Sequence, residues 1–305
     1  MAGVINTGSH PKLLWPGVHA TWGQMYAEHP EEYTDLYDIL SSSKAYEQDV
    51  QVTGFGLAPV KGQGQSVSYD SEMQGWVTTY PHIAYGLGFI VTKEELEDNQ
   101  YKEVATRRAK ANAFSMRQTL ENVSAFLYNN AFVSTYYTTP DSQPLISSAH
   151  VNPSGGTFSN ALTPGADLSE VALEDICIQI MQTTQDRGLL ISNMPQSLHI
   201  PPAEWFNANR ILKSVLQSHT GNNAINVLKA TSAFPKGIKL NHYFTSSTAW
   251  FVRTNIPNGM QFFWRNRPEF DQDNDFDTKN AKAASYMRFS VGCTDPRGIY
   301  GSKPA

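Results

Sequence analysis

Apolar and polar positions follow several different patterns along the chain, and the first 43 residues show the least order. Aromatic residues are frequent there, but a helical period appears only where Tyr33, Leu36, Tyr37 and Leu40 recur three or four positions apart. This spacing predicts a short helix within 29–40. The rest of 1–43 is predicted to be an irregular arm, whose aromatic side chains need a surface to bury them.

Residues 44–91 have the composition of β-strands. Val, Tyr, Thr, Trp and Ile dominate, and Gly and Pro interrupt them. The pattern predicts two long strands joined at a mobile tip, Val60–Gln65. A two-stranded hairpin is marginal in water by itself, and glycines within its strands weaken it further. We therefore expect this hairpin to need a partner surface, and a neighbouring chain is a candidate.

A long helix is predicted directly after the hairpin. Thr92 is a good N-cap, and Glu95 completes a capping box with it. Neither Pro nor Gly occurs from Lys93 to Ala131. An unbroken helix over this run would be on the order of 58 Å long at 1.5 Å per residue. That length exceeds the diameter of a compact domain, so the helix is expected to act as a beam along which a flat structure is built.

The remaining residues predict a loop-rich crossing, an α/β region and a β-rich tail. Helices are expected within 168–188, where Gly188 is the predicted C-cap, and within 203–219. Strands are expected at 196–202, 236–244, 248–254, 259–270 and 284–302. The mixture of separate helices and strands predicts the α+β fold class.

Composition narrows the class of protein. The chain has 305 residues. This exceeds the length that is usually built around a single hydrophobic core, so two lobes are expected. Its net charge of −5 gives no overall basic surface for nucleic acid. Cys177 and Cys293 lie far apart and are predicted to be buried thiols. The N-terminus has no signal-peptide pattern, and no apolar run is long enough to predict a membrane span.

No segment predicts catalysis. The phosphate-loop, nucleophile-elbow, zinc-protease and CxxC motifs are all missing from the sequence. Ser148 and His150 are close in sequence, but nothing in the pattern places them as a nucleophile and its base. We therefore expect no catalytic residue, no cofactor and no enzyme activity.

The best metal candidate is the acidic run Asp271–Asp277, with aspartates at alternate positions. It is similar to the start of a calcium loop, but Phe276 stands where glycine is needed and Lys282 stands where glutamate is needed. The run is predicted to be a solvated turn between two strands, and no metal site is expected.

The order of parts resembles the major capsid protein family of tailed bacteriophages, in particular its Mu-like major head subunit branch. The segments that carry this resemblance are GFGLAPVKGQGQSVSYD, QGWVTTYPHIAYGLGFIVTKEELEDNQY, NNAF, PLISSAH, LHIPP, AWFVRT and MRFSVGCTDPRGIYGS. They span nearly the whole chain, and their order is more specific than any one of them.

The resemblance implies the tailed-phage major capsid fold, with five parts along the chain. They are an N-terminal arm (1–43), an extended β-hairpin loop (44–91), a peripheral domain with the spine helix (92–150), an axial domain (151–258) and a return to the peripheral domain (259–305). The extended loop of the family lies over a neighbouring subunit. The implied interface residues are therefore Trp15, Trp22, Val60, Lys61, Gly62, Gln63, Gly64 and Gln65.

The resemblance also implies a function and partners. The chain would assemble into hexamers and pentamers of an icosahedral head, built in the host cytoplasm and found in the virion. The head would enclose double-stranded DNA without sequence-specific binding. A separate scaffold, a portal and decoration proteins are the implied partners, and no membrane is involved. Some members of the family form a covalent cross-link through a lysine near the extended loop. Lys61 lies at the loop tip of this chain, but the matching asparagine and acid motif is missing, so no cross-link is expected.

Two alternatives remain open at the level of sequence. One is an encapsulin-like cellular shell that shares the fold and encloses an enzyme cargo. The other is a soluble metal-dependent enzyme that uses the acidic run Asp271–Asp277. The contents of purified particles would separate a shell from a phage head, and a monomer that binds a divalent ion would favour the enzyme.

Overall fold

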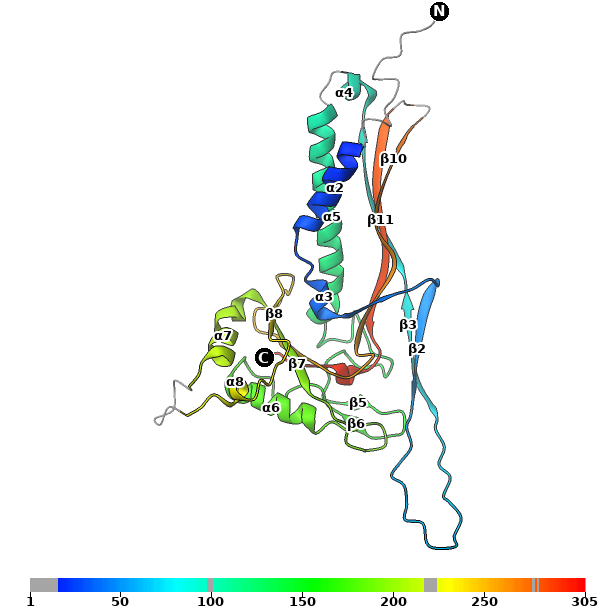
Figure 1. Cartoon of the computed structure of the whole chain (residues 1–305), viewed down its shortest axis with the longest axis vertical. Helices are drawn as coiled ribbons and strands as arrows, with labels where there is room; N and C mark the ends of the chain where they lie inside the picture. Colours follow the sequence, from blue (N-terminus) through cyan, green and yellow to red (C-terminus); the bar gives the residue numbers. More distant parts are fainter. Residues whose placement is uncertain (1–15, 98–100, 217–223, 276–277, 279, 305) are drawn as a thin grey trace, which may run out of the picture.

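The structure is a computed structural model that describes residues 16–97, 101–216, 224–275, 278 and 280–304. It has an upright slab, a lobe on one side of the slab's base and a long loop that extends beyond both (Figure 1). No helix in the described ranges combines the length and the apolar character needed to cross a bilayer.

The slab is built on a four-stranded sheet with the strand order β1-β10-β11-β4. These strands are β1 (Asp38–Ser41), β4 (Ile83–Val91), β10 (Met260–Asn274) and β11 (Ala281–Cys293). Buried and exposed residues alternate along the first part of β11, as expected for a strand covered on one face. The register between β10 and β11 shifts between Trp264 and Asn266 and again between Asn266 and Glu269, and the second interval contains Pro268, which cannot donate to the ladder.

The spine of the slab is α5 (Tyr101–Asn129), whose 29 residues extend about 43 Å. The predicted capping box is confirmed before it, at α4 (Lys93–Glu97). The Glu95 backbone N–H donates to Thr92 Oγ1 at 3.3 Å, and the Thr92 N–H donates to Glu95 Oε2 at 3.2 Å. The sequence predicts one unbroken helix, whereas the structure describes two helices, α4 and α5. Residues 98–100, which lie between them, are outside the described part.

The prediction of an irregular arm is wrong for 16–28, which form helix α2 (Pro16–Glu28) beside α5 (Figure 1). Val18 and Trp22 are buried against Ala105, Ala109 and Ala113 of α5, whose small side chains let the two helices approach. The predicted short helix is confirmed as α3 (Tyr33–Leu36), but Leu40 lies in β1 instead.

Residues 29–38 form a strap that joins the slab to the lobe. On the slab side, the Glu32 N–H donates to Glu121 Oε1 of α5 at 3.2 Å. On the lobe side, the Asp35 carboxylate pairs with Lys239 at 2.8 Å, and the Asp38 carboxylate pairs with Arg253 at 3.0 Å. Glu121 is fully buried, and its desolvation raises the pKa of its carboxyl group to about 7.

The lobe contains a second four-stranded sheet with the order β12-β9-β7-β8. Its strands are β7 (Pro195–Ile200), β8 (Ile238–Leu240), β9 (Trp250–Thr254) and β12 (Ile299–Ser302). Three helices pack on it: α6 (Glu170–Met181), α7 (Trp205–Lys213) and α8 (Val227–Ala230). The short elements are β5 (His150–Val151), β6 (Thr157–Phe158), η2 (Pro202–Glu204) and η3 (Pro296–Gly298).

Two details of this lobe differ from the predictions. Helix α6 ends at Met181 with Gln182 as its C-cap, so Gly188 is not the cap but lies in a later turn at φ 78°. The tail after residue 258 does not return wholly to the slab, because β12 pairs with β9. The predicted burial of Cys177 and Cys293 is confirmed, and both are free thiols.

The loop consists of a two-stranded ribbon and a distal segment. In the ribbon, β2 (Tyr46–Val52) pairs antiparallel with β3 (Gln74–Pro81), and residues 53–73 connect them without further strands. The predicted hairpin was too long, because β4 pairs with β11 of the slab rather than with β2. We use the name extended loop for residues 44–81.

Candidate assembly interface

The ribbon is held to the body by one of its faces. The Tyr80 and Thr294 hydroxyl groups lie 2.5 Å apart, and the Thr294 hydroxyl donates to Asp49 Oδ2 at 3.0 Å. A side chain at Gly292 would come within 2.5 Å of the Tyr80 ring, so glycine at this position lets the ring lie against β11. These contacts fix where the ribbon leaves the slab.

A clasp holds the next part of the loop to the lobe. Arg187 donates from Nη1 to both carboxylate oxygens of Asp70 at 3.0 Å, and from Nη2 to the Ser71 carbonyl at 2.5 Å. The Gly56 N–H donates to Asp70 Oδ2 at 2.9 Å. The N–H groups of Gly56 and Ser71, followed by Arg187, lower the pKa of Asp70. The clasp therefore orients the loop with a carboxylate that stays ionised at neutral pH.

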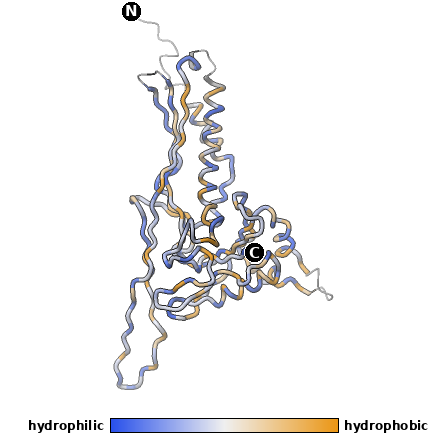
Figure 2. Tube along the Cα trace, turned by 180° about the vertical axis from the view of Figure 1, so that it is seen from behind, coloured by the Kyte–Doolittle hydropathy of each residue, from blue (hydrophilic) through white to orange (hydrophobic). Residues whose placement is uncertain are grey.

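Beyond the clasp, the distal tip at 57–69 has no support from its own subunit. Within the described chain, no hydrogen bond, ion pair or ring contact joins these residues to the body. Val60 is 99% exposed, Tyr69 94% and Leu57 83%. Figure 2 shows hydrophobic positions along the loop far from the rest of the molecule. Large apolar side chains exposed together in this way are typical of a contact surface.

The residues that the sequence predicted for an interface have three different outcomes. Val60, Lys61, Gly62, Gln63, Gly64 and Gln65 all lie in the distal tip, where the Gln65 N–H donates to the Gly62 carbonyl at 3.2 Å. Gly64 has φ +80°, which glycine adopts without strain. Trp22 is 5% exposed and stacks on Tyr26 and Phe270, so its side chain is packed within its own subunit. Trp15 lies outside the described residues.

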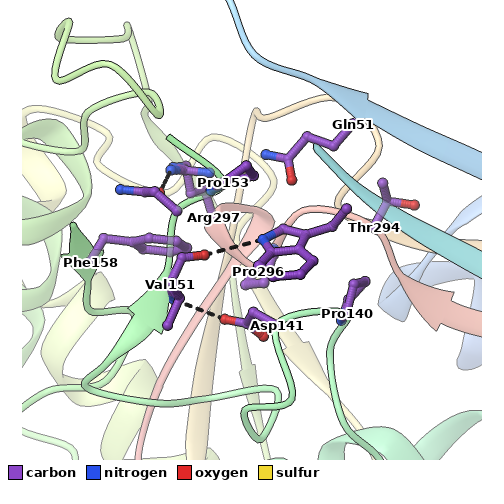
Figure 3. Close-up of a pocket in the computed structure, with 11 residues that line it drawn as sticks. Gln51, Pro140, Asp141, Val151, Pro153, Phe158, Thr294, Pro296 and Arg297 are labelled. Atoms are coloured by element: carbon purple, nitrogen blue, oxygen red, sulfur yellow. Dashed lines mark hydrogen bonds between the residues drawn. The ribbon is translucent and has the colours of Figure 1, made fainter. Parts of the chain in front are cut away.

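Two hollows lie near the loop. One lies where the ribbon meets the lobe, between Gln51, Phe158 and Arg297 (Figure 3). Trp76 also lines it, and its indole N–H donates to the Val151 carbonyl at 3.3 Å. Its volume of about 10 Å³ holds about one water molecule. A second hollow of about 300 Å³ lies beside β3, but its wall is hydroxyl-rich and contains no carboxylate, histidine or lysine.

His150 forms a buried pair, but not with Ser148. Its Nδ1 lies 2.8 Å from Asp141 Oδ2, and both side chains are almost inaccessible to solvent. Burial raises the pKa of Asp141, but the hydrogen bonds from His150, Thr139 and the Val151 N–H outweigh it and hold the pKa at about 2. The His150 ring stacks on Phe158, whose other contact is the Arg297 guanidinium at 4.1 Å. This arrangement explains the pair as a structural anchor of the 139–158 segment.

The acidic run continues β10 and enters its turn to β11. Asp271 and Asp273 are exposed on the strand, and Asp275 Oδ2 lies 2.5 Å from Lys282 Nζ. Asp277 lies outside the described residues. In the described part of the chain, no group of three or more His, Cys, Asp or Glu side chains is placed to hold a metal ion.

The comparison with family models gives one result. A model described as "Phage capsid protein" matches residues 76–302, which is most of the chain. The chain belongs to the phage capsid protein family. No curated protein sequence matches this capsid protein.

Solved capsids share the fold of this capsid protein. The capsid of Myoviridae phage XM1 matches with a TM-score of 0.53 and 12% identity over 100% of both chains. The capsid of a native GTA particle matches with a TM-score of 0.55 and 10% identity over 91% of this chain and 92% of that one. A virus-like particle from Pyrococcus furiosus matches with a TM-score of 0.54 and 11% identity, covering 95% and 99%. At such identities the likeness shows the fold, which confirms the α+β major capsid fold of tailed phages.

Family and fold together point to a structural, non-enzymatic protein of a bacteriophage capsid. The parts of the loop that the sequence analysis missed are its anchors, namely Arg187 with Asp70 and Tyr80 with Thr294. No short motif marks these pairs, because the partners are 117 and 214 positions apart. The sequence of β2 did contain one signal for these anchors. Glu47, Asp49 and Gln51 stand at every second position, so a strand places them together on one face.

Proposed function

We propose that this capsid protein assembles with copies of itself into hexamers and pentamers of an icosahedral head that encloses double-stranded DNA. One observation supports this above all: the extended loop reaches beyond its own body and exposes apolar side chains at its tip (Figures 1 and 2). Such a loop becomes fully packed when it lies on a neighbouring subunit.

The energetics of the tip favour many weak contacts. Burying one side chain such as Leu57, Val60 or Tyr69 stabilises a contact by roughly 1.5–3 kcal/mol when burial is complete. A single loop would bind weakly after the entropic cost of association. In a closed shell every subunit both gives and receives a loop, so the contacts act together. A tip with few internal contacts can also adapt to the different neighbours of a hexamer and a pentamer.

The charge of the chain is consistent with a container for DNA. Its net charge of −5 avoids the strong, salt-dependent attraction that a basic wall would have for the phosphate backbone. The proposed location is the capsid of the virion, after assembly in the host cytoplasm. A separate scaffold, a portal and decoration proteins are the proposed partners, and the peripheral and axial domains correspond to the slab and the lobe.

Deletion of Val60–Gln65 tests the proposal. The deletion is expected to prevent particle formation and to leave the subunit's melting temperature unchanged, because these residues have no contact with the body. Sedimentation and negative-stain electron microscopy measure assembly, and circular dichroism measures folding. A matched variant that replaces the same six residues by Gly and Ser keeps the loop length and removes Val60 and Lys61. Normal particles from the deletion would contradict the proposed role of the tip.

The contents of native particles test the second part. The fold is also that of a virus-like particle from Pyrococcus furiosus, so fold alone does not show what a shell of this chain encloses. Double-stranded DNA of one length inside the particles supports a phage head. Particles that contain an enzyme and no DNA would instead support the encapsulin-like alternative.

A further inference from the structure

The hollow of about 300 Å³ beside β3 is large enough for a small ligand. Its walls are residues 77–80 of β3, residues 137–140 with Ser142, and Val291 with Gly292 at the end of β11. The described residues that line it include none from β2, so it lies along the edge of β3 that faces away from its one strand partner. Such an edge presents backbone N–H and C=O groups that can bond to a ligand. We call this space the hydroxyl hollow.

One almost buried side chain in this hollow points to a ligand. Thr78 is only 9% exposed, yet its hydroxyl group has no hydrogen-bond partner within the described chain. The hydroxyl oxygen is not sealed off from solvent, so it opens into the hollow that Thr78 lines. A largely buried hydroxyl without a protein partner is unfavourable, because it has lost solvation and gained no hydrogen bond within the protein. A ligand hydroxyl at this point can donate to it or accept from it.

Ser142 supplies a second observation. Its φ of 64° lies in the left-handed region, where a residue other than glycine is uncommon. The hydroxyl groups of Ser142 and Thr138 also have no partner within the described chain, and both residues line the hollow. The Ser142 N–H donates to the Thr139 carbonyl at 2.8 Å, which holds this turn in its strained form. Strain of this kind is concentrated at functional sites, where it positions binding groups in advance.

The walls of the hollow are held in place from behind. Tyr137 Oη accepts from the Cys293 N–H at 2.9 Å, and the Thr139 hydroxyl donates to the Gln143 carbonyl at 2.9 Å. These two hydroxyl groups are therefore used within the subunit, in contrast to the three that have no partner. Walls that are already fixed reduce the entropic cost of binding a ligand.

The lining selects for a neutral ligand. Among the described residues that line the hollow, none is charged. An unpaired charge is costly to remove from water, so neither an anion nor a cation suits these walls. Val77, Pro140 and Val291 add apolar patches between the hydroxyl groups. We propose that the hydroxyl hollow binds one ring of a neutral sugar, whose hydroxyl groups meet the three unpartnered hydroxyls and whose C–H face meets the apolar patches. This site does not depend on the proposed function.

Binding of glucose, galactose and mannose to the purified full-length chain tests the site. Saturation-transfer NMR detects binding, and isothermal titration calorimetry measures the dissociation constant. A ring with about twelve non-hydrogen atoms, at the efficiency of ordinary ligands, gives a dissociation constant on the order of millimolar. We expect at least one of the three sugars to bind in this range. The matching uronic acid, in which a carboxylate replaces the CH₂OH group, should bind at least about tenfold more weakly.

Two variants of Thr78 separate its hydroxyl group from the shape of the site. Thr78→Val removes the hydroxyl and keeps the shape, so sugar binding should weaken about fivefold or more. Its melting temperature should not fall, since the hydroxyl bonds to nothing within the described chain. Thr78→Ser keeps the hydroxyl and should bind within about twofold of the wild type. Ser142→Gly should also weaken binding without lowering the melting temperature, because glycine adopts a positive φ without strain.

Three results would overturn the proposal, and none of them affects the proposed assembly. They are no binding of any of the three sugars up to about 50 mM, equal binding by Thr78→Val and the wild type, and equal binding of the uronic acid. A trisaccharide that ends in the binding sugar identifies the source of the ring. Equal binding of the trisaccharide and the free sugar supports the end of a glycan chain, and binding of the free sugar alone supports a dissolved monosaccharide.

Discussion

Trp22 gives the sharpest test of how the N-terminal part of the capsid protein is held. Its indole stacks on Tyr26 and Phe270 at centroid distances of 5.1 and 5.3 Å, and its N–H donates to Asn112 Oδ1 at 2.9 Å. Replacing such a buried tryptophan by alanine costs about 3–5 kcal/mol. At about 1.4 kcal/mol per factor of ten, α2 should detach from α5 roughly a hundred to a few thousand times more often.

The matched variant is Trp22→Phe, which keeps an aromatic ring between Tyr26 and Phe270 and removes the N–H. Asn112 Oδ1 also accepts from the Ser285 hydroxyl at 2.6 Å, so it does not become fully unsatisfied. The phenylalanine variant should therefore lose only about 1–2 kcal/mol. Both losses should appear in the isolated subunit, since the contacts of Trp22 with Tyr26, Phe270 and Asn112 lie within it.

Hydrogen–deuterium exchange of peptides covering α2 measures this opening directly, and urea unfolding measures any change in the whole subunit. We expect exchange in the order Trp22→Ala fastest, Trp22→Phe intermediate and wild type slowest. The reasoning is refuted if α2 exchanges at the wild-type rate in Trp22→Ala subunits. If that variant then fails only to assemble, Trp22 acts between subunits, as the sequence analysis predicted.

Two further predictions concern the strap and the clasp. Because the pKa of Glu121 is raised from 4.5 to about 7, the folded subunit binds this proton more tightly than the unfolded chain, and its free energy of unfolding falls as pH rises through that interval. From about pH 5 to pH 8, the free energy of unfolding of Glu121→Gln, measured with urea, should therefore rise relative to that of the wild type by up to about 3 kcal/mol. If the two proteins differ in free energy of unfolding by the same amount at about pH 5 and at about pH 8, this prediction is contradicted. Arg187→Ala should speed hydrogen exchange in peptides that span 53–56 and 70–73 without changing the melting temperature, and Arg187→Lys should do so less. Unchanged exchange in Arg187→Ala would show that the clasp does not hold the loop.

The elements that the sequence predicted correctly are those specified by neighbouring residues. The Thr92–Glu95 capping box begins a helix because both residues bond to backbone groups within one turn. Helix α2 was missed although Val18, Trp22, Met25 and Tyr26 follow a helical spacing, since Pro16, Gly17 and Gly23 obscured it. Proline at a first helical position and exposed glycines do not prevent a helix that is held by tertiary packing.

The candidate interface was predicted only at its tip. Val60–Gln65 were identified because Gly and polar residues interrupt two strand-like runs, which is a local signal. The clasp of Arg187 and Asp70 and the pair of Tyr80 with Thr294 were not identified, since each depends on which side of the hairpin meets the body. Trp22 was assigned to an interface because the sequence does not reveal that Trp22 packs between α5 and Phe270 of β10.

The amino-acid sequence by itself determined the helical run after Thr92, the strand character of the loop and tail, the lack of a catalytic motif and the resemblance to phage capsid proteins. These follow from backbone preference, capping and periodicity, which act over a few residues. Only the tertiary structure decided that β4 joins β11, that β12 joins the lobe and that Glu47, Asp49 and Gln51 of β2 face the body. Strand pairing depends on contacts between distant residues, such as the Ser285 hydroxyl and the Leu87 carbonyl, 198 positions apart. Many pairings satisfy the same local preferences, and only packing of the whole chain selects among them.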